Sequence, residues 1–160
     1  MHAELRLRAS EMDDEAFLRR VYAGTRTHEI ALAGWDAAGA DAFLRMQFDA
    51  QQRHYRAYYP QVRFDIVERA GEAIGRLYVA RHADAIHVLD IALLAPWRGQ
   101  GIGAALLRVL QEEAAREGRR LTLQVALNNR AHALYARLGF TNTALQGLHQ
   151  AMEWRAPSTA

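Results

Sequence analysis

The strongest constraint on the fold is a change of hydrophobic period at a glycine-rich stretch, residues 98–103 (RGQGIG). Before it come three runs, at 62–69, 74–81 and 86–94, in which apolar residues alternate with other residues or follow one another, and short turn segments separate the runs. This pattern is typical of an antiparallel meander. After it, apolar residues recur at helical spacing: Ile102, Leu106, Leu107 and Leu110. Strands followed by helices predict an α/β fold (α+β) with a mixed sheet.

The first sixty residues are predicted to be mainly helical. Residues 5–8 alternate as a short strand, and Ser10 can cap the helix that follows. Residues 33–42 are predicted to form a loop. A longer helix is then expected from about residue 41 to residue 58, and Pro60 ends it.

After the glycine stretch the two periods alternate. Gly118 is placed to end the helix that starts at the glycines. A buried strand at 121–127 and a second helix at 130–139 come next, and two short strands are expected near 141–145 and 148–154.

Composition is that of one globular domain over residues 1–160, because 51% of the chain is hydrophobic and no linker or repeat is visible. The net charge of +2 gives no reason to expect a nucleic-acid or membrane partner. Cysteine is absent, which excludes disulfides, thiolate zinc sites and a cysteine nucleophile. Neither a signal peptide nor an apolar run long enough to span a membrane is visible, so a cytoplasmic location is expected.

The glycine stretch is predicted to bind a diphosphate. A helix N-terminus leaves its first N–H groups unpaired, and glycines let a phosphate approach them. The alternative is a tight turn that merely begins a helix. A Walker loop requires lysine, which this chain lacks, and a dinucleotide fingerprint would follow a strand of a parallel unit rather than a meander.

The chain resembles the GNAT superfamily of N-acetyltransferases in two motifs. Residues 98–103 match the family's Gln/Arg-x-x-Gly-x-Gly/Ala motif, and residues 128–140 (NNRAHALYARLGF) resemble its Asn-x-x-Ala-x-x-Leu-Tyr-x-x-Leu-Gly-Phe motif. The element order is also similar over nearly the whole chain. The resemblance implies a six- to seven-stranded, mostly antiparallel sheet with about four helices. It also implies that the strand before the glycines splays from the next parallel strand.

Acetyl-CoA is the co-substrate that the resemblance implies, with no metal. The main chain of Ile91, Ala92 and Leu93 would hold the pantetheine arm. Asn128 would contact the cofactor, or cap the helix near residue 130, or both. The loop residues implied in binding are Arg98, Gly99, Gln100, Gly101, Ile102, Gly103 and Ala104. Pro96 lies one position later than in the family pattern, which alters the expected shape of the loop.

Direct acetyl transfer to an amine needs an acid and a base. Tyr135 matches the family tyrosine that protonates the departing sulfur beside the cofactor, although it can also be read as a packed helix aromatic. A common family glutamate is replaced by Gln124, which cannot accept a proton. His87 lies eleven residues before Arg98, where histone-acetylating members have a glutamate, so it is the candidate base. A surface histidine is the alternative for His87, and Asp90, Glu68 or water remain in reserve.

The function implied by the resemblance is N-acetylation of a primary amine, on a small molecule or a peptide. Transfer of another acyl group and non-catalytic sensing of acyl-CoA remain as alternatives, and a homodimer is left open. Acceptor binding is expected over the first helices and their loop, which supply Glu29, Trp35 and Asp36. The two carboxylates would suit a cationic amine, and the alternative is that they are solvated surface.

Overall fold

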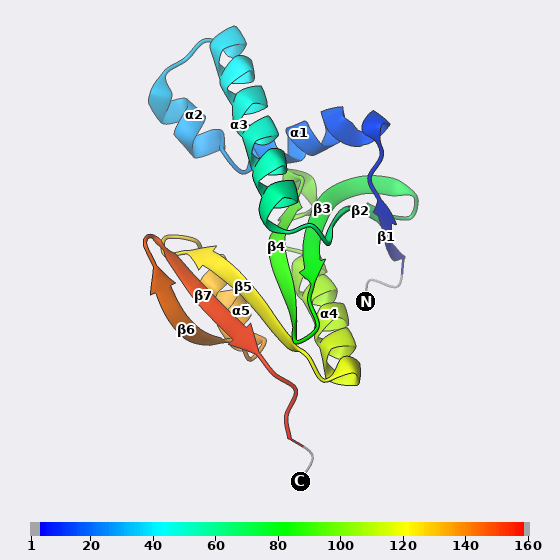
Figure 1. Cartoon of the computed structure of the whole chain (residues 1–160). Coiled ribbons are helices and arrows are strands. Elements are labelled where there is room, and N and C mark those ends of the chain that lie inside the picture. The colour runs from blue at the N-terminus through cyan, green and yellow to red at the C-terminus, as the bar shows by residue number, and fades with distance from the viewer. Residues whose placement is uncertain (1–3, 159–160) are drawn as a thin grey trace. The chain divides into compact units, whose positions relative to one another are not determined.

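The computed structural model describes residues 4–158 (Figure 1). In chain order the elements are β1 (Leu5–Ala9), the 3-10 helix η1 (Met12–Asp14), α1 (Glu15–Gly24), α2 (Thr27–Ala33), α3 (Ala37–Tyr58), β2 (Val62–Arg69), β3 (Glu72–Arg81), β4 (Ala85–Leu93), the 3-10 helix η2 (Ala95–Trp97), α4 (Ile102–Glu117), β5 (Arg120–Ala126), α5 (Ala131–Arg137), β6 (Thr141–Gln146) and β7 (His149–Trp154). The strands follow the hydrogen-bonded order β1-β2-β3-β4-β5-β7-β6. β4 and β5 are parallel, whereas the pairs β1–β2, β5–β7 and β6–β7 are antiparallel. The predicted mixed sheet is thereby confirmed.

Two compact units make up the chain. The first comprises Met1–Tyr78 and Asp90–Arg98, and the second comprises Val79–Leu89 and Gly99–Ala160. The boundary runs through β3 and β4, so each of these strands contributes one part to each unit.

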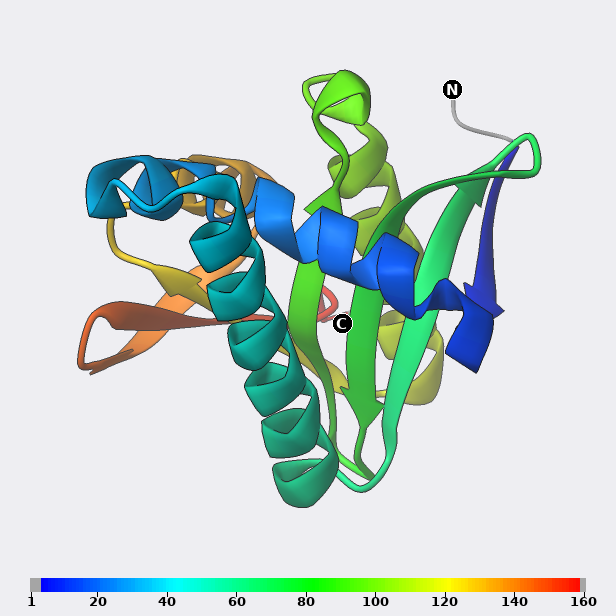
Figure 2. The same ribbon diagram turned by 90° about the horizontal axis from the view of Figure 1, so that it is seen from above.

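In the first unit, α1 and α3 cover one face of β2 and β3 (Figure 2). α1 buries Leu18, Val21 and Tyr22, and the ring of Tyr22 meets the ring of Phe48 on α3 edge-on at 6.1 Å between centroids. Burying such aromatic and aliphatic side chains is the main source of stability for a helix layer on a sheet. Phe17, on the same helix, is only half-buried.

The helix starts in this unit differ from the prediction. Ser10 does not cap a helix, because its N–H extends the strand pairing and donates to the Phe64 carbonyl at 2.8 Å. The cap lies one residue later, where the Glu11 N–H donates to the Asp14 carboxylate at 2.8 Å. Asp36 accepts from the Gly39 N–H at 2.7 Å and starts α3 at Ala37. The predicted loop over 33–42 was therefore mostly wrong, and α2 is an additional helix.

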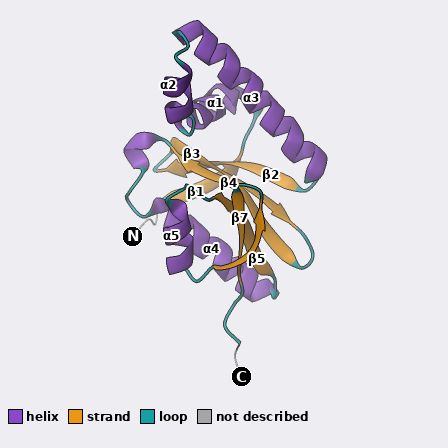
Figure 3. Ribbon diagram, turned by 90° about the vertical axis from the view of Figure 1, so that its left-hand side faces the viewer, coloured by secondary structure: helices purple, strands orange, loops and turns teal. Residues whose placement is uncertain are grey.

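The second unit confirms the period change that the sequence predicts. α4 buries Leu106, Leu107 and Leu110, and β5 buries every second residue, Leu121, Leu123 and Val125. α4 and α5 both pack on β5 and lie on the same side of it (Figure 3). α4 ends at Gly118, whose φ of +66° is the left-handed conformation that favours glycine.

Among residues 4–158, the longest helix, α3, is amphipathic, and no helix is both long enough and apolar enough to cross a membrane.

Candidate functional site

The glycine loop opens α4 in the second unit. Gly99 and Gly101 have φ values of +74° and +79°, which glycine adopts without strain. Ala105 N–H donates to the Gly101 carbonyl at 3.0 Å, which is the first bond of the α-helical pattern. The amides of residues 102–104 therefore have no acceptor within the helix. A Cβ atom built on Gly99 or Gly103 would meet nothing within 4 Å, so a ligand has room to approach these amides.

The end of β4, in the first unit, is held by backbone contacts. Leu94 N–H donates to the Ile74 carbonyl at 2.8 Å. A Cβ atom on Gly75 would clash with the Ala92 carbonyl oxygen and lie 2.7 Å from Leu93 Cδ2. Gly75 therefore allows β3 to approach β4 closely. Sequence reasoning missed this residue, although an isolated glycine inside a strand pattern is a signal of close backbone approach.

Arg98 follows β4 and stabilises its end. Its Nε donates to the Leu93 carbonyl at 2.9 Å, and a second guanidinium nitrogen donates to the Gly24 carbonyl at 3.3 Å. The side chain thus connects β4 to the end of α1. Its predicted contact with the cofactor stays a prediction, and the observed contacts are with backbone carbonyls.

Parallel pairing of β4 with β5 covers only part of each strand. The register joins Ala85–Val88 to Arg120–Leu123, although β4 continues to Leu93 and β5 to Ala126. Ile91, Ala92 and Leu93 lie beyond this register and are half-buried. An early end of the pairing is what the implied splay requires.

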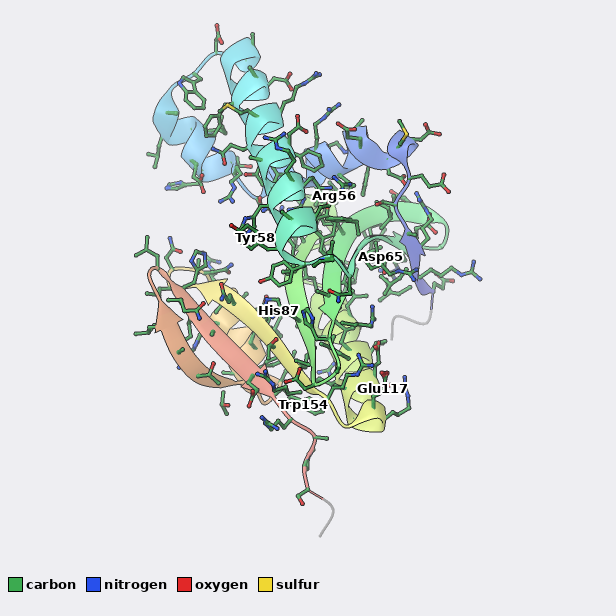
Figure 4. The ribbon with its side chains drawn as sticks, viewed as in Figure 1. Arg56, Tyr58, Asp65, His87, Glu117 and Trp154 are labelled. Carbon is green, nitrogen blue, oxygen red and sulfur yellow. The ribbon has the colours of Figure 1, made fainter. Side chains whose placement is uncertain are left out.

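His87 lies on β4 in the second unit, opposite Thr122 of β5 (Figure 4). Its Nδ1 is 2.7 Å from the Thr122 hydroxyl. Burial lowers the pKa of His87, and the neighbouring His82 and Arg120 side chains lower it further. The imidazole is therefore neutral at pH 7, which is the form that can accept a proton.

Tyr135 and Asn128 also belong to the second unit. Tyr135 lies on α5, is 8% exposed, and has its ring 5.9 Å from that of Phe140. Asn128 is exposed in the turn after β5. The suggestion that Asn128 caps α5 is wrong, because Asn129 Oδ1 accepts from the Ala131 N–H at 2.9 Å and fills that role.

Gln124, at the position of the family glutamate, and the two reserve bases Glu68 and Asp90 all have side-chain partners. Gln124 Nε2 donates to Gln146 Oε1, and the Glu68 carboxylate accepts from Arg8 Nε at 2.8 Å. Asp90 accepts from Arg76 at 2.5 Å and keeps 17% of its side chain exposed.

Arg76 is a buried cation that sequence reasoning missed. Its side chain is 1% exposed, and its guanidinium lies over the rings of Tyr22 and Tyr78. It also donates to Gln51 Oε1 at 3.2 Å. Burial raises the pKa of Tyr78 and of Tyr55, so both phenols stay neutral beside this ion pair. The signal in the sequence was an arginine within the otherwise apolar part of residues 74–81.

Within the described part of the chain, no group of three or more histidine, aspartate or glutamate side chains is arranged to hold a metal ion. The features that suit a ligand are the α4 amides and the end of β4 that lies beyond the β5 pairing. In the second unit, the α4 amides suit a pyrophosphate. In the first unit, the main chain at the end of β4 suits a ligand that carries amide groups.

Comparison with known proteins places these features in a family. The family described as "Acetyltransferase (GNAT) domain" matches residues 60–142, just over half of the chain. An aminoalkylphosphonate N-acetyltransferase of Salmonella typhimurium is 35% identical over 89 residues, which span 51% of this chain and 58% of that relative. The match thus covers little more than half of the relative's length.

Solved structures show the same fold. The PaiA N-acetyltransferase of Thermoplasma acidophilum, in complex with coenzyme A, superposes with a TM-score of 0.71 and 16% identity over 95% of this chain and 99% of that one. An acetyltransferase from Thermus thermophilus gives a TM-score of 0.70 and 21% identity, covering 98% of this chain and 100% of that one. With both predicted motifs inside the matched region, the chain belongs to the GNAT acetyltransferase family.

Proposed function

We propose that this protein transfers an acetyl group from acetyl-CoA to a primary amine. The observation that supports this most directly is the start of α4, where unpaired amides and open space above Gly103 occur in a chain of the GNAT family. Acetyl-CoA supplies an activated thioester when bound. The protein's own residues then bind the coenzyme, orient it, and move two protons.

Coenzyme binding is assigned to backbone groups. The amides of residues 99–104, at the positive end of the α4 dipole, would neutralise the pyrophosphate. Main-chain groups of Ile91–Leu93, which lie beyond the β4–β5 register, would pair with the amides of pantetheine. Asn128 is assigned to contact the cofactor, because the capping of α5 is done by Asn129.

Tyr135 is assigned as the proton donor to the departing sulfur. Its ring is fixed by packing beside Phe140, so replacing the hydroxyl alone would leave the packing intact. The pKa of a free phenol, about 10, is close to that of a thiol, about 8.5, so transfer of the proton is nearly balanced.

His87 is assigned as the base. If Nδ1 donates its proton to the Thr122 hydroxyl oxygen, the Nε2 lone pair is the one that accepts a proton from the amine. The lowered pKa keeps the imidazole unprotonated at neutral pH. Asp90, ion-paired with Arg76, is better suited to attract the ammonium form of the acceptor than to remove its proton.

The acceptor we propose is a small molecule with a primary amine. The Salmonella relative is named for aminoalkylphosphonates, which are small molecules that carry an amine. The rings of Trp35, between α2 and α3, and Phe43, on α3, lie 4.5 Å apart at a tilt of 58°, and Trp35 is exposed, so it offers apolar surface to such a molecule.

Thiol release from acetyl-CoA, measured with a panel of small amines and supported by mass spectrometry of the product, tests the proposal. We expect turnover with at least one amine and none with Gly103→Glu, which would block the pyrophosphate. A protein that binds acetyl-CoA yet acetylates no amine in the panel would contradict transfer and indicate the sensor alternative. Propionyl-CoA in place of acetyl-CoA measures the acyl preference in the same assay.

A further inference from the structure

The last part of β4 is supported by β3 beyond the point where its pairing with β5 ends. The register with β5 stops at Val88. After it, the Leu94 N–H donates to the Ile74 carbonyl at 2.8 Å, and Gly75 leaves room for the Ala92 carbonyl. These contacts enclose the stretch of β4 whose main chain is assigned above to the pantetheine arm. The position of that stretch therefore depends on β3.

Arg76 of β3 forms an ion pair with Asp90, the residue immediately before the assigned stretch. One of its terminal nitrogens donates to the Asp90 carboxylate at 2.5 Å and to Gln51 Oε1 at 3.2 Å. The other donates to the Tyr78 hydroxyl at 3.5 Å. The guanidinium carbon lies 5.5 Å from the centre of the Tyr22 ring. Side chains of α1, α3 and β3 thus hold the guanidinium in place, and the guanidinium holds Asp90.

Stability alone does not account for a buried guanidinium at this place. The Arg76 side chain is 1% exposed, and burying a charge removes its hydration, a cost that an ion pair offsets only in part. Two apolar side chains of similar volume would fill the same space about as favourably. A planar guanidinium, by contrast, makes directed hydrogen bonds that determine where a carboxylate lies. What the arginine adds is therefore a defined position for Asp90.

From these contacts we propose that Arg76 is a positioning residue for coenzyme binding. It acts through Asp90 to hold the main chain of Ile91–Leu93 in place for the amides of pantetheine. This inference rests on the proposed function, because that function assigns the pantetheine arm to Ile91–Leu93. Arg76 itself is buried and touches no substrate in this role.

The coenzyme and its nucleotide half together test the proposal. The nucleotide half, 3′-phospho-ADP, carries the pyrophosphate and lacks the pantetheine arm. Calorimetric titration of the full-length protein with acetyl-CoA and with 3′-phospho-ADP measures both affinities in the absence of an acceptor. In Arg76→Met we expect the affinity for acetyl-CoA to fall about tenfold or more, while the affinity for 3′-phospho-ADP stays within about twofold of the parent's. A general loss of folded protein would instead lower both affinities.

Arg63→Met is the matched control. It breaks another arginine–carboxylate pair of the first unit, in which Arg63 Nε lies 2.6 Å from Asp65 Oδ1. Both residues belong to β2, which is not a neighbour of β4 in the sheet. We expect Arg63→Met to bind acetyl-CoA and 3′-phospho-ADP as the parent does.

An unchanged affinity of Arg76→Met for acetyl-CoA, or an equal loss with both ligands, would overturn the positioning role. If Arg76→Met does not fold, Asp90→Asn takes its place, with the same selective loss expected and its absence overturning the role. A parent protein that binds no acetyl-CoA would refute the proposed function, and the positioning role with it. A parent that acetylates an amine, together with an Arg76→Met variant of unchanged affinities, would refute the positioning role alone.

Discussion

Glycines serve opposite purposes in the two units. In the second unit, Gly99 and Gly103 have nothing within 4 Å of where a Cβ would be, and they leave backbone amides open to a ligand. In the first unit, Gly75 has no such space, because the Ala92 carbonyl and the Leu93 side chain occupy it. The same residue type provides room for binding in one place and close packing in the other. Substitution at these sites should therefore damage different properties.

The largest effect is expected at Gly75. Gly75→Val would force β3 away from β4, because the contact is with backbone and cannot relax by a side-chain rotation. We expect a loss of about 3 kcal/mol or more of unfolding free energy, as for other severe overpacking. Urea denaturation measures it. A Gly75→Val protein as stable as the parent would mean that glycine is not required at this contact.

The next largest effect is expected for Tyr135→Phe, on the turnover rate rather than on the unfolding free energy. Loss of a general acid typically lowers the rate by about 10² to 10⁴, whereas the ring keeps its contact with Phe140. Single-turnover kinetics and calorimetry with acetyl-CoA should show slow chemistry and unchanged affinity. Turnover within threefold of the parent, with chemistry rate-limiting, would exclude Tyr135 as the acid.

Gly103→Glu tests the other half of the glycine comparison. A Cβ at this position meets nothing within 4 Å, so the protein should fold, but the negative charge of the glutamate would occupy the phosphate position. We expect the affinity for acetyl-CoA to fall about 100-fold, which corresponds to about 2.7 kcal/mol. Gly103→Ala is the control and should raise helix stability by up to about 1 kcal/mol. Unchanged affinity in folded Gly103→Glu would remove the pyrophosphate from this loop.

A smaller effect is expected when His87 is replaced, and it should appear in the pH dependence of kcat/KM. A base must be deprotonated, so kcat/KM should rise with pH through the pKa of His87, which burial and the nearby His82 and Arg120 place below the usual value of about 6.5. His87→Gln should abolish this rise of kcat/KM with pH and lower the rate about tenfold or more. If kcat/KM of His87→Gln still rose over the same pH range, the titrating group would be the acceptor amine or another residue.

The smallest effects separate the two adjacent asparagines. Asn129→Ala should lower the unfolding free energy by about 1 kcal/mol, because it removes the cap of α5. Asn128→Ala should leave stability unchanged and weaken acetyl-CoA binding. Thermal unfolding and calorimetry on both variants measure the difference. The opposite result, with Asn128→Ala destabilising, would reverse the two roles.

Much of the second unit could be predicted because its signals are local. The helical spacing from Ile102 to Leu110, the stop at Gly118 and the alternation in β5 each depend on residues close together in the chain. Both family motifs are likewise continuous segments. The helix starts in the first unit were harder to predict, since Ser10 makes a strand contact with Phe64, which is distant in the sequence. That residues 1–160 act as one domain stays a prediction.

By itself, the sequence determined the order of strands and helices after residue 60, the glycine loop at the start of α4, and the resemblance to the GNAT family. Only the tertiary structure decided that Gly75 lets the end of β4 approach β3, that Arg76 is buried against Asp90, and that Gln52 Oε1 is buried without a partner among the described residues. The physical reason is distance along the chain. A period or a motif is written in neighbouring residues, whereas a close backbone approach, a buried ion pair or an unpaired atom depends on which distant segments pack together.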